Sequence, residues 1–202
     1  MLALRLPQRL SAHRRSRAYW CVVFQVATLA ALVLPNVASA ANGFTEERAS
    51  ARWLIAFQCP DGTTAADGRL IVETDNFIEA GTTRDPNPPL RLGFVGQCPD
   101  GTFSWGFVQP APTQFDQDLK NVSLSGTFTN VRDNRGGVHT VSVEALWTGT
   151  GPIITTVNGP GSKGKERSAT ATATIVFDGT TLVDGAANFP FPAPFIRVDI
   201  EK

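Results

Sequence analysis

The sequence predicts an all-β fold, an antiparallel β-sandwich of about nine or ten short strands, with a closed β-barrel as the alternative. Apolar and polar residues alternate over much of the chain beyond residue 52, which is the period of a half-buried strand. Turn-forming residues separate these stretches. No long apolar run indicates parallel strands joined by helices. These three observations favour one antiparallel sheet system.

Residues 1–40 have the features of a signal peptide. Five arginines come before or at the start of an apolar run at 20–34, and Ala38-Ser39-Ala40 forms a small-residue cleavage site. The alternative is an uncleaved anchor, but the run is shorter than the ~20 apolar residues that a spanning helix needs. We therefore expect a secreted protein, extracellular or periplasmic. Residues 41–202 would form a single β-domain with no membrane span after leader cleavage.

The charge of the mature chain argues against two classes of partner. All 18 acidic residues lie beyond Ala40, together with 13 of the 18 basic residues, which leaves a formal charge of −5. A mildly acidic domain gives no reason to expect nucleic acid or an anionic membrane as partner.

One hexapeptide, Gln-Cys-Pro-Asp-Gly-Thr, occurs twice, at 58–63 and at 97–102. Proline and Asp-Gly favour tight turns, so each copy predicts a hairpin tip. The two copies contain the only cysteines beyond the leader, Cys59 and Cys98. In an oxidising compartment we expect them to form one disulfide. Two free thiols remain an alternative, and zinc would lack ligands because only one histidine accompanies them. No cofactor is expected.

The expected elements follow in chain order. Residues 45–48 are the one helix candidate, a short turn before the first strand. Loops are expected at 81–89, which is rich in proline, and at 158–166, which is rich in glycine and lysine and has no candidate for burial. Strands are expected at 53–58, 69–73, 90–96, 103–108, 122–129, 141–147, 153–157, 169–177, 180–183 and 195–200.

Three of these predictions have the strongest local support. Apolar runs flank the second tip on both sides, which predicts a hairpin over 90–108. Strict alternation in 122–129 and 141–147, with a turn at 133–137, predicts an antiparallel pair. In 169–177 most apolar positions are alanine, which suggests that another sheet or chain approaches closely there.

Histidine and carboxylates are the candidates for catalysis. His139 could act as a general base, but by alternation it shares the inward face of Val141 and Trp147, and no G-x-S-x-G motif accompanies it. Paired carboxylates could cleave a glycosidic bond. The outward-facing candidates for such a pair are Asp61, Asp100, Glu73 and Glu144. In the two tips the aspartate more often serves the turn itself.

Several side chains could bind a ligand instead. Phe103, Trp105 and Phe107 share one face, either as core, which we expect, or as a platform for sugar rings. The basic residues Lys163, Lys165 and Arg167 could bind an acidic polysaccharide or phosphate. The segment 159–165 has the letters of a phosphate-binding loop, but Glu166 and a strand follow instead of Ser or Thr and a helix. The phenylalanines expected to cover an open end of the sandwich or barrel are Phe189, Phe191 and Phe195.

Few ionisable groups and no recognisable nucleophile favour a non-enzymatic function. We expect a secreted binding or surface module whose partner is a carbohydrate or another protein. One alternative is a small secreted polysaccharide hydrolase that uses paired carboxylates. The other is a β-barrel with an internal pocket for a small apolar ligand.

Overall fold

A computed structural model describes residues 43–202, and these form antiparallel strands. The predicted signal peptide and its cleavage site lie outside the described residues. Within residues 43–202 there is no helix that is long and apolar enough to cross a bilayer.

Eleven strands form one hydrogen-bonded sheet, which confirms the all-β prediction. The sheet does not close into a barrel, because β4 and β5 stand at the two ends of the hydrogen-bonded order. The strands are β1 (Phe44–Gln58), β2 (Thr64–Glu79), β3 (Pro89–Cys98), β4 (Gly101–Pro110), β5 (Thr113–Phe115), β6 (Asn121–Arg132), β7 (Val138–Gly149), β8 (Ile154–Gly159), β9 (Ser162–Phe177), β10 (Thr180–Ala186) and β11 (Phe195–Glu201).

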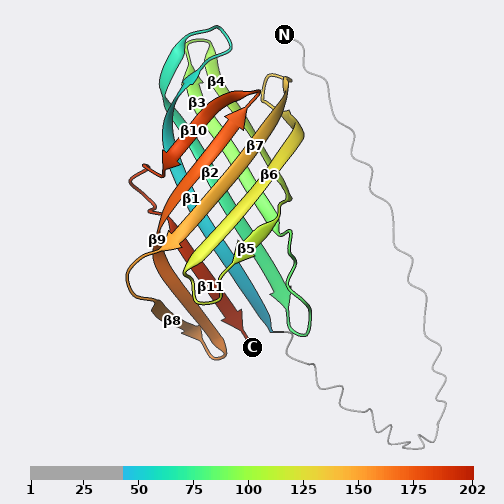
Figure 1. Cartoon of the computed structure of the whole chain (residues 1–202), viewed down its shortest axis with the longest axis vertical. Helices are drawn as coiled ribbons and strands as arrows, with labels where there is room; N and C mark the ends of the chain where they lie inside the picture. Colours follow the sequence, from blue (N-terminus) through green and yellow to red (C-terminus); the bar gives the residue numbers. More distant parts are fainter. Residues whose placement is uncertain (1–42) are drawn as a thin grey trace, which may run out of the picture. The chain divides into compact units, whose positions relative to one another are not determined.

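The long strand β9 belongs to two layers. Its first half pairs with β8 and β11, and its second half, from Ala169, pairs with β7 and β10. The first sheet therefore runs β4-β3-β2-β1-β11-β9-β8, and the second sheet runs β10-β9-β7-β6-β5. Figure 1 shows β6, β7 and β9 of the second sheet crossing in front of β1, β2 and β3. This is a sandwich-like arrangement whose layers are joined by one continuous strand.

The inward faces of the two sheets form the core. Trp53 of the first sheet and Trp147 of the second are 2% and 0% exposed. Ala171 of β9 pairs with Trp147 and is itself buried. A small side chain beside a large one lets the two layers interdigitate at close packing. The alanine positions of β9 thus face the opposite sheet.

The strands are longer than predicted at several ends. Residues 45–48, expected as a helical turn, lie in β1, where Glu46 pairs with Phe77 on one side and Asp199 on the other. Pairing with two neighbouring strands outweighs the weak local helix preference of a short charged segment. The three-residue strand β5 was not expected, because prolines precede it and its own sequence is too short to show a period.

The loop predicted at 158–166 is wrong. Strand β8 continues to Gly159 and β9 begins at Ser162, so only a two-residue turn lies between them. Gly164 is buried and pairs with Thr156 on one side and Asp199 on the other. Glycine and lysine are poor strand formers alone, but hydrogen bonds on both edges hold this segment extended.

Candidate functional site

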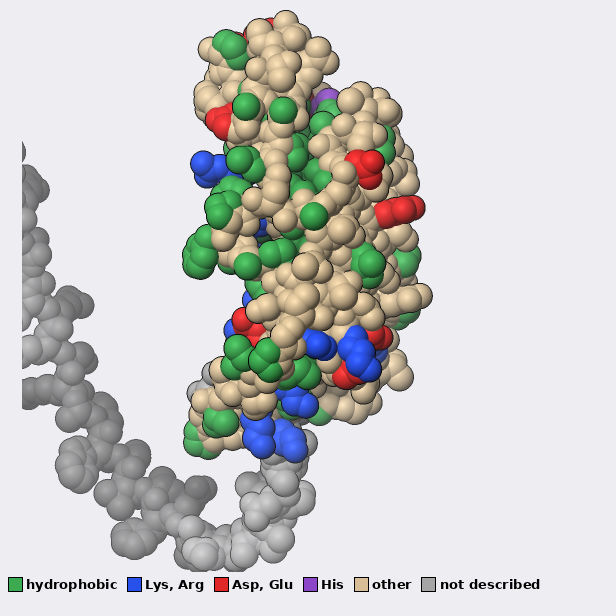
Figure 2. Space-filling view, turned by 60° about the vertical axis from the view of Figure 1, so that its left-hand side comes forward, with side chains coloured by type: hydrophobic (Ala, Val, Ile, Leu, Met, Phe, Trp, Pro, Cys, Tyr) green, Lys and Arg blue, Asp and Glu red, His purple; other side chains and the backbone are tan. Residues whose placement is uncertain are grey.

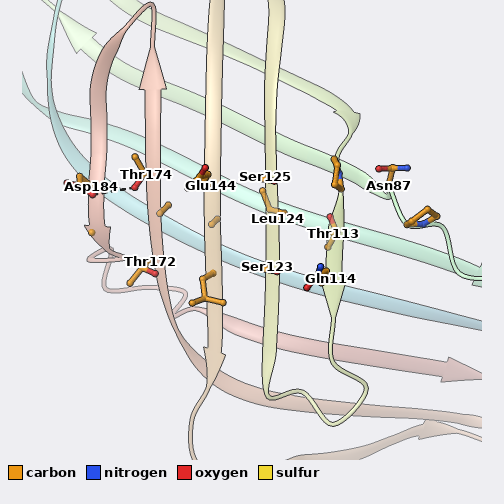
Figure 3. Close-up of a pocket in the computed structure, with 16 residues that line it drawn as sticks. Asn87, Thr113, Gln114, Ser123, Leu124, Ser125, Glu144, Thr172, Thr174 and Asp184 are labelled. Carbon is orange, nitrogen blue, oxygen red and sulfur yellow. Dashed lines mark hydrogen bonds between the residues drawn. The ribbon is translucent and has the colours of Figure 1, made fainter.

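A groove of about 810 Å³ lies on the outer face of the second sheet. It crosses the sheet from β5 to β10, with the loop residues Pro86 and Asn87 at one side and Asp184 and Gly185 at the other. Four strand spacings separate β5 from β10, or about 19 Å. We call this the polar groove (Figure 3).

The antiparallel register aligns the polar side chains of the groove in two rows. One row joins Ser125, Glu144, Thr174 and Asp184 across β6, β7, β9 and β10. Figure 3 shows the Thr174 hydroxyl hydrogen-bonded to Asp184, with an oxygen-to-oxygen distance of 3.3 Å. Since alternate side chains of a strand share a face, these residues point outward while their neighbours fill the core.

The second row joins Gln114, Ser123, Leu146 and Thr172 across β5, β6, β7 and β9. Leu146 is the one large apolar side chain that these two rows present outward, and it is 43% exposed. Hydroxyls both donate and accept hydrogen bonds, and the amide of Gln114 does the same. The groove can therefore bind a ligand that is itself rich in hydroxyl or amide groups.

Among residues 43–202, Glu144 and Asp184 are the only charged residues that line the polar groove. Thr174 of β9 lies between them, so two strand spacings separate their backbones, about 10 Å. Two carboxylates without a cation give the groove a negative potential. This favours neutral or cationic ligands over anionic ones.

The loop beside the groove is anchored from inside the sandwich by Arg84. Arg84 Nη2 lies 2.7 Å from Glu47 Oε2, and Arg84 Nη1 donates to the Phe115 carbonyl at 2.8 Å. Glu47 is 5% exposed, and burial raises its pKa although Arg84 and Asn76 act in the opposite direction. The Thr113 amide also donates to the Pro86 carbonyl at 3.0 Å. These contacts fix the loop and β5 as one wall of the groove.

His139 lies at one end of the sandwich between two carboxylates. Its Nδ1 is 2.7 Å from Asp178 Oδ2, and its Nε2 is 3.0 Å from Asp133 Oδ2. The ring also packs on Phe177, with ring centroids 4.4 Å apart. Asp133 belongs to the turn between β6 and β7, and Asp178 to the turn between β9 and β10. His139 thus joins the two turns.

The hydrogen bonds of His139 determine its protonation. Burial by itself would lower the pKa of His139, but the bonds to Asp178 and Asp133 outweigh it and raise the pKa. Burial would likewise raise the pKa of Asp133 and of Asp178, and the bonds to His139 and to backbone amides lower both. Two carboxylate acceptors favour the imidazolium, which donates from both nitrogens. Because both ring nitrogens are hydrogen-bonded to carboxylates, His139 fits a structural link between the two turns better than a general base.

The two repeated tips lie side by side and are joined by a disulfide between Cys59 and Cys98, with 5.9 Å between Cα atoms. Asp61 accepts hydrogen bonds from the Thr63 amide at 3.0 Å and from the Thr63 hydroxyl at 2.7 Å. The Asp100 carboxylate instead accepts two hydrogen bonds from the Arg135 guanidinium, at 2.5 and 2.7 Å. Both tip aspartates therefore serve the local structure.

The four carboxylates singled out from the sequence do not come together. Glu73 lies on the outer face of the first sheet, where Arg48 Nε is 3.5 Å away. Glu144 lies in the polar groove on the opposite sheet. The other carboxylate in the groove is Asp184, which lies two strands away from Glu144 and which sequence reasoning missed.

The aromatic residues of β4 belong to the core. Phe103 and Trp105 are 6% and 5% exposed, and Phe107 packs on Phe128 with centroids 4.6 Å apart. The stripe is therefore unavailable as a sugar platform. Phe191, expected to cover an open end, is 80% exposed instead.

The basic residues around Lys165 are part of β9 and not of a loop. Because no helix follows them, the phosphate-loop letters at 159–165 have no structural counterpart. Within residues 43–202, no group of three or more potential ligands is placed to hold a metal ion.

In comparisons with protein-family models, curated proteins and solved structures, nothing matches this chain. The candidate site therefore depends on the geometry described above.

Most residues of the polar groove were not singled out from the sequence. Alternation did predict that Ser123, Ser125 and Thr172 point away from the core. It did not predict which strands are neighbours, because pairing between β7 and β9 joins segments separated by β8 and two turns. The signal in the sequence that pointed toward the groove was therefore the outward polar face of β6 and β9.

Proposed function

We propose that this domain is a secreted, non-enzymatic binding module that takes a polysaccharide chain along the polar groove. The observation that supports this most directly is the groove itself, in which two cross-strand rows present hydroxyls, an amide and carboxylates along about 19 Å. Side chains fixed on paired strands lose little freedom when a ligand binds, which favours affinity.

Charge narrows the polysaccharide class. Glu144 and Asp184 line the groove, and no basic residue of the described part of the chain lines it with them. We therefore expect neutral or cationic chains to bind and anionic chains to be repelled.

Affinity electrophoresis tests this with three probes: neutral xylan, cationic chitosan and anionic polygalacturonate. Thr172→Val removes one groove hydroxyl at nearly constant shape, and should weaken retention by about threefold to tenfold, the value of one net hydrogen bond. Thr170→Val is the matched control, because Thr170 lies on the same face of β9 but outside the groove. Retention of none of the probes, or equal retention by both variants and wild type, contradicts the proposal.

A hydrolase remains the second candidate because Glu144 and Asp184 face the same groove. Their backbone spacing of about 10 Å is compatible with the wider carboxylate separation of inverting enzymes. Release of reducing ends from a retained probe, abolished in Glu144→Gln, would favour this candidate. Retention without release favours the binding module.

A further inference from the structure

A second groove, of about 400 Å³, lies on the outer face of the first sheet. Its outward side chains come from β1, β2 and β3 and from the segment after β10. They are Arg52, Arg69, Ile71, Val95 and Phe189, and Gly93 lines the groove beside Ile71. We call this the arginine groove, and it is independent of the polar groove on the other sheet.

The absence of a side chain at Gly93 leaves this groove hollow. The register places Arg52, Ile71, Gly93 and Gly106 in one row across β1, β2, β3 and β4. A Cβ built on Gly93 would meet no atom closer than 3.5 Å, the distance to Ile71 Cγ2. Packing therefore does not require glycine at position 93, and a larger side chain there would occupy the groove.

The wall formed by Phe189 is fixed by hydrogen bonds to β1. The Phe189 amide donates to the Arg52 carbonyl at 3.3 Å. The adjacent Asn188 accepts from the Leu54 amide at 2.6 Å and donates to the Leu54 carbonyl at 3.0 Å. The ring of Phe189 is thereby held beside the Arg69 guanidinium, whose carbon is 5.9 Å from the ring centroid.

The charge of the arginine groove is positive although the domain is acidic. No carboxylate lines it, and within residues 43–202 neither Arg52 nor Arg69 forms an ion pair. Arg52 Nε is buried and has no hydrogen-bond partner among the described residues. Along β2, Asp67 lies two residues before Arg69 and Glu73 lies two residues after Ile71. Glu73 is engaged by Arg48, and neither carboxylate lines the groove. Two guanidinium groups without a carboxylate partner favour an anionic ligand.

Figure 2 shows hydrophobic side chains gathered along one side of the described domain, with basic ones among them. In the arginine groove, Ile71, Val95 and Phe189 supply such an apolar surface, and Val95 is 44% exposed. The combination of apolar walls and a few convergent polar groups is typical of small-molecule sites. A volume of about 400 Å³ suits a ligand of that size.

We propose that the arginine groove binds a small organic anion with an apolar body. Its carboxylate or sulfonate would accept hydrogen bonds from Arg52 and Arg69. Its body would lie over Gly93, between Ile71 and Phe189. Arginine suits this role because its planar donors match a carboxylate and its face also packs on an aromatic ring.

The test uses the fluorescent anion 8-anilinonaphthalene-1-sulfonate, followed by competition with laurate and with dodecanol. We expect saturable fluorescence enhancement, displacement by laurate, and at least tenfold weaker displacement by the uncharged dodecanol. The double variant Arg52→Gln/Arg69→Gln should weaken dye binding at least tenfold, and Gly93→Leu should do the same by filling the groove. Arg132→Gln, at an exposed arginine of β6, is the matched control and should leave the affinity unchanged.

Circular dichroism of each variant separates lost binding from lost folding. If Gly93→Leu fails to fold, the double arginine variant still tests the proposal. Both of its positions face outward, so we expect this variant to fold. Non-saturating dye binding, equal displacement by dodecanol, or unchanged affinity in the folded double variant would overturn the proposal. Because the polar groove lies on the other sheet, none of these outcomes bears on polysaccharide retention.

Discussion

His139 illustrates at the scale of single residues how tertiary structure assigns a role. The same side chain that could act as a base in isolation is bonded to Asp133 and Asp178 at both ring nitrogens. Its side chain is 16% exposed, so these bonds are only partly screened by water. The result is a charged contact that joins two turns.

This contact makes stability depend on pH with a defined sign. The pKa of His139 is higher in the folded chain than in the unfolded one. Its stabilisation is therefore complete below about pH 6.5, the unfolded value, and is lost as pH rises through the folded value. The lowered pKa values of Asp133 and Asp178 act at the acid end: their stabilisation is present above about pH 3.9 and is lost as pH falls.

Replacement of the imidazole tests the first of these effects. His139→Gln should lower the free energy of unfolding by about 1.5 to 3 kcal/mol near pH 6, the range for hydrogen bonds to charged groups. It should also remove most of the decline in stability between about pH 6 and about pH 9. Urea denaturation across this range measures both. His139 is the only histidine beyond the predicted leader, so an unchanged slope in the variant would contradict this assignment.

At the scale of elements, β9 connects the two layers. Its first half has β8 and β11 as neighbours, and its second half has β7 and β10. The buried alanines of the second half leave room for Trp147 and the opposite sheet. The spacing of the layers therefore depends on small side chains at these positions.

Enlarging one of these alanines should separate the layers. Ala171→Leu adds volume next to fully buried Trp147, and overpacking of this kind costs about 1 to 3 kcal/mol. Thr170→Leu, the neighbouring exposed position, should stay within about 0.5 kcal/mol of wild type. Chemical denaturation of the two variants gives the comparison. Equal stabilities would show that β9 is not closely packed against the core at this position.

At the scale of the whole molecule, the disulfide links the β1–β2 tip to the β3–β4 tip. Cys59 and Cys98 are separated by 39 positions in the sequence, and both are buried. A covalent link of this kind acts mainly on the unfolded chain, whose freedom it reduces. The disulfide therefore stabilises the folded domain as a whole rather than the two tips alone.

Removal of the link should lower the stability of the domain substantially. Cys59→Ser/Cys98→Ser should lose about 4 kcal/mol of unfolding free energy, the value that the chain-entropy model gives for a closed loop of about 40 residues. Denaturation midpoints measure the loss. Mass spectrometry after alkylation of the unreduced wild type provides the control. Labelling of both thiols without reduction, or equal stability of variant and wild type, would contradict the prediction.

Much of the fold could be predicted because its signals are local. Alternation located most strands and showed which side chains face the core, including Trp147 and Phe103. Turn chemistry located the tips, where Gly62 has a φ of 85°, a conformation that other residues rarely adopt. Local preference misled at 45–48 and at 158–166, because strand neighbours on both edges hold those segments extended.

Neither groove could be read from the chain alone. The sequence by itself determined the all-β class, the outward polar face of β6 and β9, and two cysteines placed in matching turns. Tertiary structure decided that Glu144 lies near Asp184, that Arg52 and Arg69 share an apolar groove, and that His139 lies between two carboxylates. The physical reason is that a strand specifies its own two faces through a period of two residues. Its neighbours are selected only when the whole sheet assembles.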